Sequence, residues 1–202
     1  MVLRSRGVEI VATREPGGTA TGERIRQLLL DVRTAGLDPY AELALMFASR
    51  AQHLREVILP ALAAGQVVLC DRFTDSSEAY QGGGRKLGSA AILDLHRILC
   101  GGLQPDLTIL MDSDVGSSVE RARRRNRDRS PDIADESRFE SENRAFFTRV
   151  HNAYLEIAKR EPQRVLLVDA RGSAEQTHGK IVDLVLARMN VPVEPRRTRN
   201  AG

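Results

Sequence analysis

The sequence has no tryptophan, only two cysteines, three lysines and 4% aromatic residues. Cys70 and Cys100 form neither a disulfide framework nor a metal-binding spacing, so we expect a protein of a reducing compartment, the cytoplasm. No apolar run approaches the roughly 18 residues of a membrane span, and we therefore expect no membrane partner. The 202 residues, 42% of them hydrophobic and 28% charged, are enough for one domain with its own core.

Arginine supplies almost all of the positive charge. The chain has 30 basic and 27 acidic residues, a net charge of +3, and its only lysines are Lys86, Lys159 and Lys180. One interpretation is a genome rich in guanine and cytosine, whose codons favour arginine. The other is that planar guanidinium groups, which bind phosphate through two hydrogen bonds, hold a phosphorylated ligand.

Short apolar runs alternate with longer segments of helical periodicity, a pattern typical of a doubly wound parallel sheet with helices on both faces. The predicted strands are Val8–Ala12, Val67–Cys70, Leu107–Met111 and Val165–Val168. The predicted helices are Gly22–Asp31, Tyr40–Leu62, Ala90–Leu99, Asp114–Arg125, Glu140–Arg160 and Ala174–Met189. We expect a single α/β domain over residues 1–190 and a disordered tail over residues 191–202.

Polar and charged residues follow every predicted strand. In an open parallel sheet the ligand lies beyond the carboxyl ends of the strands. One charged residue there is usually only solvated, but four such strand ends on one rim favour a phosphorylated ligand with magnesium. The residues concerned are Thr13, Arg14, Glu15, Asp71, Arg72, Asp112 and Asp169.

Two segments directly after strands suggest a binding site. Thr13–Thr19 (TREPGGT) is either a loop whose glycine amides bind phosphate or an ordinary Pro-Gly turn. Asp71–Arg85 (DRFTDSSEAYQGGGR) predicts a helix that Gly82–Gly84 end. Helix capping or core packing could explain each polar residue of this helix taken alone. Four hydrogen-bonding residues within two helical turns instead favour contact with a ligand, and they are Ser76, Ser77, Tyr80 and Gln81.

Arg50 interrupts the apolar stripe of its helix, three residues after Phe47. Either its side chain reaches solvent at the helix edge, or it donates to a ligand base stacked on a neighbouring aromatic or thioether group.

Arg121–Arg129 contains six arginines and is followed by a helix-breaking Ser130-Pro131. The segment is a nucleic-acid patch, a solvated helix face, or a lid whose arginines close over phosphates. Because the segment has no interleaved aromatic residues and the net charge of the chain is low, we expect no nucleic-acid partner. We favour a lid over about residues 121–140.

These segments together resemble the bacterial thymidylate kinases, from about Gly7 to about Met189. They follow the family's order: TREPGGT, the Phe-Ala-Ser-Arg helix, DRF with AYQGGGR, PDLTILMD and the arginine-rich lid. The resemblance implies the fold of a nucleoside monophosphate kinase. It also implies transfer of the γ-phosphate of ATP to dTMP, giving dTDP, with Mg²⁺ and in a homodimer.

The resemblance also implies roles for single residues. Arg72 would hold the acceptor phosphate, Asp71 would lie at the magnesium–phosphate centre, and Arg125 and Arg138 would join them in catalysis. The implied substrate-binding residues are Arg14, Glu15, Pro16, Met46, Phe47, Arg50, Arg72, Ser76, Ser77, Tyr80 and Gln81. The implied ATP-binding residues are Arg121, Arg125, Asp169 and Ala170. The family's stacking aromatic lies four residues before the arginine, where this chain has Met46, so the thymine platform is either Met46 or Phe47.

The chain departs from the family pattern at its start, because it has no G-x-x-x-x-G-K-[ST] phosphate loop and its only Gly-Lys pair is Gly179-Lys180. The family's strand before that loop is central, so we expect two strands left unpaired in the middle of the sheet and severely impaired phosphoryl transfer. We interpret this as an incompletely read gene or a truncated clone. The lid also has extra residues before Arg138, with Ser137 where aspartate is usual.

Two other functions stay open beside a dTMP kinase. One is a catalytically inactive nucleotide-binding protein, and the other is a kinase for another nucleoside monophosphate.

Overall fold

The computed structural model describes residues 2–114, 116, 120 and 138–189. All four predicted strands are present, and each ends one or two residues later than predicted. The strands are β1 (Ile10–Arg14), β2 (Val67–Asp71), β3 (Thr108–Asp112) and β4 (Val165–Asp169). The longer helices are α1 (Ala20–Leu30), α2 (Pro39–His53), α5 (Ser89–Cys100), α7 (Arg144–Arg160) and α8 (Ala174–Arg188). The shorter segments are η1 (Arg4–Arg6), η2 (Val32–Thr34), η3 (Leu54–Ile58), α3 (Leu59–Ala63), α4 (Thr74–Ser77) and η4 (Glu78–Gly84).

The strands form two parallel pairs rather than one continuous sheet. β1 pairs with β2, from Ile10 opposite Val67 to Arg14 opposite Asp71. β3 pairs with β4 in the same way, and within the described residues β2 and β3 do not pair. The expectation of unpaired strands in the middle of the sheet is therefore confirmed.

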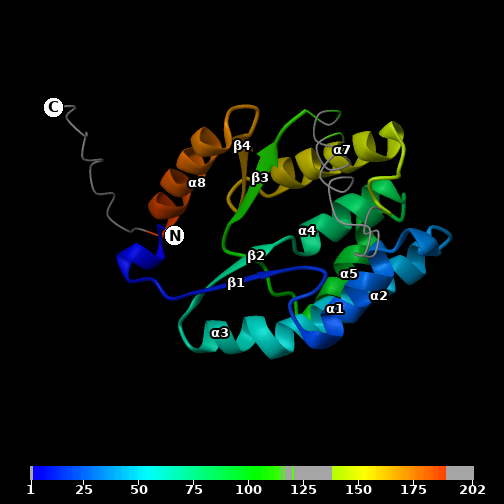
Figure 1. Ribbon diagram of the computed structural model, residues 1–202, viewed down its shortest axis with the longest axis horizontal. Coiled ribbons are helices and arrows are strands. Elements are labelled where there is room, and N and C mark those ends of the chain that lie inside the picture. The colour runs from blue at the N-terminus through cyan, green and yellow to red at the C-terminus, as the bar shows by residue number, and fades with distance from the viewer. Residues whose placement is uncertain (1, 115, 117–119, 121–137, 190–202) are drawn as a thin grey trace.

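The same split leaves the expectation of one common rim a prediction, because the two pairs are not hydrogen-bonded to each other within the described residues. The first pair runs across Figure 1 towards α4, whereas β3 and β4 run upwards. Glu15, Asp71 and Arg72 follow the first pair, and Asp112 and Asp169 end the second. The residues at the strand ends therefore form two groups.

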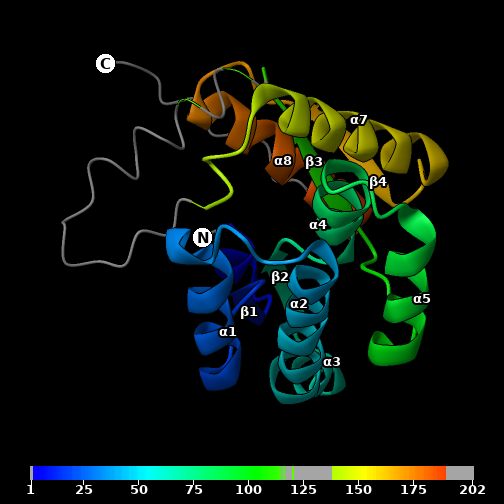
Figure 2. The same cartoon turned by 90° about the vertical axis from the view of Figure 1, so that its right-hand side faces the viewer.

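The helices pack in two groups around these strands, as Figure 2 shows, with α1, α2 and α5 on one side and α7 and α8 on the other. One apolar cluster joins α2, η3 and α5 through fully buried Phe47 and Ile92. A second joins α7 to η4 through Phe146 and Ala79. A third holds Leu186 of α8 against β1 and the segment before it.

Side-chain caps explain where the helices begin. α1 starts two residues earlier than predicted because the Thr19 hydroxyl accepts the Gly22 amide at 2.9 Å. α7 starts later than predicted because Asn143 caps the Phe146 amide at 2.9 Å. The predicted helix Tyr40–Leu62 is realised as α2, a π-helical turn (η3) and α3 in direct succession.

The helix after Asp71 ends at Gly84, as predicted, and its last seven residues form the π-helical segment η4. A side chain at Gly84 would place its Cβ 2.5 Å from Cε2 of Phe146, and one at Gly83 would lie 2.7 Å from Cβ of Ala153. These glycines therefore allow η4 to pack closely against α7.

Several predictions lie outside the described residues. They are most of the helix Asp114–Arg125, the lid as far as residue 137 with Arg121 and Arg125, and the tail 191–202. In the part of the chain that is described, no helix is both long enough and apolar enough to cross a membrane.

Candidate functional site

The loop between β1 and α1 is held by side chains from α1 and α2. Glu23 accepts the Gly18 amide through Oε1 and the Arg14 guanidinium through Oε2, both at 2.9 Å. Ser49 accepts the Gly17 amide at 3.2 Å. Both glycine amides are thus already bonded, and the hypothesis that they bind phosphate is wrong for this conformation. The Glu15–Pro16 peptide is cis.

Arg50 is the most constrained charged group at this end of β1. Its side chain is 3% exposed, so it does not reach solvent at the helix edge. Nε donates to Oε2 of Glu15 at 2.6 Å, and Nη2 donates to Ser77 at 3.0 Å. The guanidinium lies 4.7 Å from the ring centre of Phe47 and 5.3 Å from that of Phe73. Nη1 is buried and has no hydrogen-bond partner.

An unpaired buried donor costs about 1–3 kcal/mol, and Nη1 is therefore available to a ligand that could pair with it. Ser77 was predicted to touch the ligand, but it is 2% exposed and holds Arg50 instead. Phe73 was missed, although it directly follows the Asp71-Arg72 pair.

Arg72 leaves β2 in a left-handed backbone conformation, with φ of 69°. Such a conformation is strained for a residue other than glycine and is typical of functional sites. The exposed guanidinium lies 5.0 Å from the centre of the Tyr80 ring and donates to its hydroxyl at 3.4 Å. The carboxylate of neighbouring Asp71 is exposed and has no hydrogen-bond partner among the described residues.

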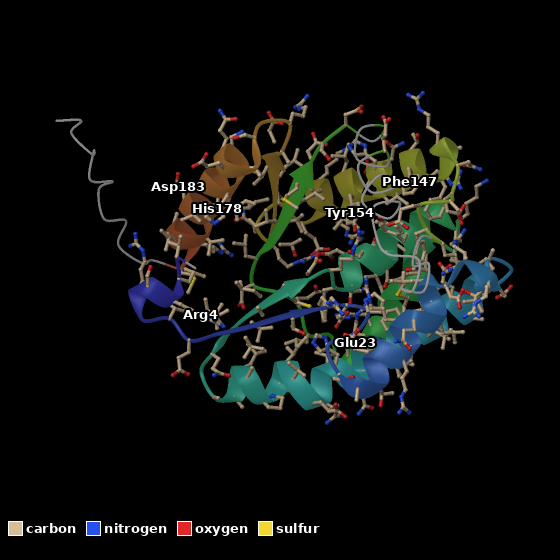
Figure 3. All side chains as sticks on the ribbon, in the orientation of Figure 1. Arg4, Glu23, Phe147, Tyr154, His178 and Asp183 are labelled. Atoms are coloured by element: carbon tan, nitrogen blue, oxygen red, sulfur yellow. The ribbon has the colours of Figure 1, made fainter. Side chains whose placement is uncertain are left out.

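Tyr154 is a further residue at this end that the sequence-based prediction missed. It lies on α7 facing α4 (Figure 3), and its hydroxyl donates to Ser76 at 2.8 Å. Burial raises the pKa of Tyr154, so the hydroxyl stays protonated and acts as the donor. Its ring centre lies 6.4 Å from that of Tyr80. The signal available was helical periodicity alone, which does not separate a site tyrosine from a core one.

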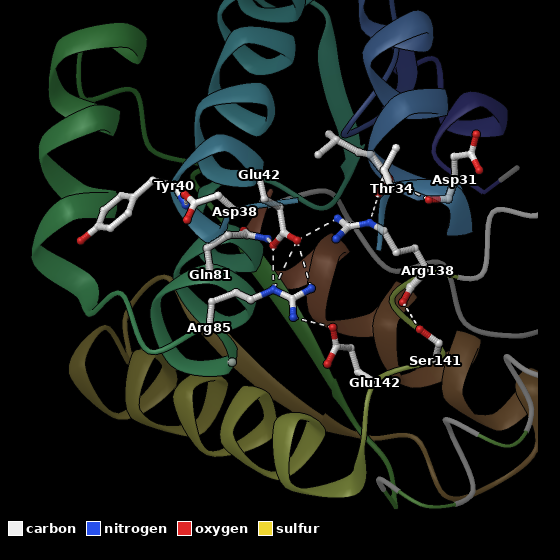
Figure 4. Close-up of polar contacts among 12 residues, drawn as sticks. Asp31, Thr34, Asp38, Tyr40, Glu42, Gln81, Arg85, Arg138, Ser141 and Glu142 are labelled. Atoms are coloured by element: carbon white, nitrogen blue, oxygen red, sulfur yellow. Dashed lines mark hydrogen bonds and ion pairs between the residues drawn. The ribbon is translucent and has the colours of Figure 1, made fainter. Parts of the chain in front are cut away.

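Gln81 and Arg138 belong to a separate buried cluster around Glu42 (Figure 4). Glu42 is 0% exposed and accepts Gln81 Nε2 at 2.8 Å and Arg85 Nη2 at 3.0 Å. Nη2 of Arg138 lies 2.8 Å from the same carboxylate, and its Nε donates to the Leu29 carbonyl at 2.5 Å. Arg85 also pairs with Glu142. Arg138, which was assigned to catalysis by resemblance, is 2% exposed and committed to this cluster.

The two candidates for the thymine platform differ in position. Phe47 is 0% exposed and packs in the core with Arg50 over its ring. Met46 packs at the edge of the cluster that contains Tyr80. Phe47 therefore lies beside Arg50, whereas Met46 packs against the same cluster as Tyr80, and the platform stays a prediction.

The polar residues at the end of the β3–β4 pair make hydrogen bonds and ion pairs of their own. Asp112 pairs with His151 on α7 at 3.0 Å. Asp169 accepts Arg171 Nε at 2.8 Å, and hydrogen bonds from Arg171 lower the pKa of Asp169. The Ala170 amide donates to the Asp112 carbonyl at 2.8 Å.

Glu15, His53 and Cys70 bring three potential metal ligands within 4.8 Å of one another. Both nitrogens of His53 and both oxygens of Glu15 are already hydrogen-bonded, and Arg50 supplies a positive charge beside them. Burial, followed by the negative charge of Glu15, raises the pKa of the Cys70 thiol to about 12. The three groups therefore do not suit a metal ion, because a metal-binding cysteine must be a thiolate.

Two pairs of parallel strands with helices packed around them (Figure 2) define an α/β protein. The family model for thymidylate kinase matches residues 1–181. The chain therefore belongs to the thymidylate kinase family of enzymes.

Similar proteins agree with this assignment. Thymidylate kinase from Desulfovibrio desulfuricans is 55% identical over 168 residues, 83% of this chain and 77% of that protein. The enzyme from Pelobacter propionicus is 47% identical over 184 residues, 91% of this chain and 83% of that protein. The crystal structure of thymidylate kinase from Ehrlichia chaffeensis superposes with a TM-score of 0.67 at 29% identity, covering 88% of this chain and 80% of that one. The predicted α/β nucleotide kinase fold is thus confirmed.

Proposed function

We propose that this chain belongs to an enzyme that transfers the γ-phosphate of ATP to dTMP, giving dTDP for dTTP synthesis. The observation that carries the proposal is Arg50, which is fixed at Nε and Nη2 and held between two rings, with Nη1 unpaired. A donor nitrogen at a fixed place suits a carbonyl oxygen on the edge of a pyrimidine. Met46 would support the face of that base.

Arg72 would bind the acceptor phosphate. Among the described residues it donates only one long hydrogen bond, to Tyr80, so the rest of its planar fork is available for two phosphate oxygens. Stacking on Tyr80 fixes the plane of the guanidinium before the ligand arrives. Arg14, Glu15 and Pro16 would line the acceptor side of the site. Glu15 would act through Arg50, and Arg14 is already paired with Glu23.

Asp71 fits a magnesium ligand, because its exposed carboxylate has no hydrogen-bond partner among the described residues. Mg²⁺ prefers one or two carboxylates together with substrate phosphates, and it would neutralise charge on the transferring phosphoryl group. Asp71 would therefore hold the ion beside the phosphate that Arg72 binds.

The donor side is less complete. Of the predicted ATP residues, Asp169 and Ala170 lie at the β3–β4 edge, where their bonds are to their own strands, Arg171 and Lys180. The 202 residues contain no phosphate loop, and Lys180 donates to the Asp169 carbonyl from within α8. Asp169, Ala170 and Lys180 are thus bonded within the protein and offer no free group to the ATP phosphates.

A coupled assay with ATP and dTMP tests the proposal on two proteins, the 202-residue chain and the same chain preceded by a strand, a G-x-x-x-x-G-K-[ST] loop and a helix. We expect turnover only in the extended protein. Specific dTMP binding without turnover in both would favour a catalytically inactive nucleotide-binding protein. Preference for another nucleoside monophosphate in the extended protein would replace dTMP as the substrate.

Two substitutions in the extended protein test the residue roles. Arg72→Ala should abolish acceptor turnover, whereas Arg50→Ala should mainly reduce discrimination between dTMP and other nucleoside monophosphates. Wild-type kinetics in both variants would show that the site is elsewhere. The homodimer and the cytoplasmic location stay predictions, which sedimentation and cell fractionation test.

A further inference from the structure

We propose that His53 is a positioning residue which, with its proton on Nδ1, holds Glu15 and through Glu15 orients Arg50. The inference rests on the proposed role of Arg50 in reading the base. His53 lies on α2, three residues after Arg50, and is 0% exposed. The sequence-based prediction gave it no role.

The hydrogen bonds of His53 define which nitrogen carries the proton. Nδ1 lies 2.9 Å from Oε1 of Glu15, and Nε2 lies 2.6 Å from the Thr13 hydroxyl. A carboxylate has no proton to donate, so Nδ1 is the donor in the first bond. With this one proton on the ring, as proposed, Nε2 is bare and accepts from the Thr13 hydroxyl. The bonds thus run in one direction from Thr13 through His53 to Glu15.

Glu15 divides its two oxygens between His53 and Arg50. Oε1 accepts the imidazole and Oε2 accepts Arg50 Nε at 2.6 Å. Without a donor on Oε1, that buried oxygen would be unpaired, and the nearest cation to pair with it is the same guanidinium. Arg50 would then turn towards a two-point pair with Glu15. Because that pair would use Nε and Nη2, the bond to Ser77 would be lost and Nη1 would no longer be held at a fixed place, so His53 keeps Arg50 oriented for the ligand.

The packing around the ring excludes a role in proton transfer to the ligand. Both nitrogens are engaged, and a Cβ at Gly18 would lie only 2.6 Å from Cδ2 and Nε2 of His53. The imidazole is therefore pressed between α2 and the loop, with no path to a reacting group. It can act on the ligand only through Glu15 and Arg50.

Two substitutions separate positioning from simple packing. His53→Asn keeps an amide N–H at the place of Nδ1, whereas His53→Gln places its amide near Nε2 and leaves Oε1 of Glu15 without a donor. The matched control is His96→Asn, because His96 is also buried, at 3% exposed, and its Nδ1 bonds a threonine, Thr74, at 2.9 Å.

Calorimetry with dTMP and with dUMP on the 202-residue chain provides the first measurement. We expect His53→Gln to weaken dTMP binding about tenfold, the effect of losing one hydrogen bond to a charged group. His53→Asn should stay within about threefold of wild type, and His96→Asn within about twofold. Equal losses in all three variants, or none in His53→Gln, would overturn the proposal.

The second measurement needs no ligand. Nitrogen NMR of the wild-type chain should show the His53 proton on Nδ1 and a bare Nε2. The Arg50 Nε–H should exchange slowly in wild type and His53→Asn, and at least about tenfold faster in His53→Gln. A proton on Nε2, or unchanged exchange in His53→Gln, would overturn the proposal. If the wild type binds no nucleotide but these results hold, the positioning of Arg50 stands and the proposed function fails.

Discussion

Replacing Glu42 by glutamine should lower the free energy of unfolding by about 3–5 kcal/mol, the usual cost of removing one partner from a buried ion pair. Glutamine keeps the shape of the side chain and an oxygen that can still accept the amide of Gln81. What the change removes is the negative charge that pairs with Arg85 and Arg138.

The two arginines do not lose the same share of their ion pairs in this variant. Arg85 is 17% exposed and keeps Glu142 as a second carboxylate. Arg138 is 2% exposed, and after the change its guanidinium keeps the bond to the Leu29 carbonyl and its place over the Phe139 ring, 4.5 Å from the ring centre, but no carboxylate. Most of the expected cost is therefore the burial of the Arg138 charge without a counter-charge.

Urea unfolding followed by circular dichroism measures the effect as a lower midpoint with an unchanged slope. The control is Asp94→Asn, because Asp94 pairs with Arg97 while both side chains are about 70% exposed (68% and 73%), and it should cost about 0–1 kcal/mol. In the double variant with Arg138→Met, much of the loss should be recovered, because no buried charge is left unpaired. If Glu42→Gln cost no more than Asp94→Asn, the buried cluster would not stabilise the fold as reasoned.

Two further predictions concern other parts of the fold. Gly84→Ala should lower the free energy of unfolding by about 1–3 kcal/mol in the same urea experiment, because its Cβ would lie 2.5 Å from Phe146. The control is Gly36→Ala, which should be neutral because nothing lies within 4 Å of the added Cβ. Equal losses in the two variants would contradict this. Burial and then the charge of Arg50 lower the pKa of His96 below 6.5, so its unfolded form binds the proton more tightly. The contribution of His96 to stability is complete above pH 6.5 and is lost as the pH falls below that value. Acidification from pH 7 to pH 5 should therefore destabilise the wild-type protein more than His96→Gln. An equal pH dependence of the two proteins would refute this.

The sequence predicted those parts of the fold that depend on local pattern. Continuous apolar runs separated by helical periodicity were enough for the four strands and their parallel arrangement. Gly82–Gly84 were correctly predicted to end a helix, but the local pattern did not show that Gly84 also packs closely against Phe146, some 60 residues later in the chain. Contacts of that separation leave no periodic trace.

The same distinction applies to the site. Arg50 and Arg72 could be found because each breaks a local pattern, an apolar stripe in one case and a strand end in the other. Their supports could not. Ser77 and Glu42 look like ordinary polar residues, and only the fold brings Ser77 to Arg50 and Glu42 to Arg138.

The residues predicted to bind dTMP and those predicted to bind ATP follow different strand pairs, so we expect the two affinities to respond differently to the segment between the pairs. Arg50 and Arg72 depend on groups that belong to the β1–β2 half or pack on it, such as Glu15 and Tyr80. Asp169 at the β3–β4 edge makes its bonds within its own half. The 202-residue chain should therefore bind dTMP as tightly as the extended protein while binding ATP much more weakly, a difference that calorimetry with each nucleotide measures. Parallel losses of both affinities would mean that the acceptor site also depends on the segment that completes the sheet.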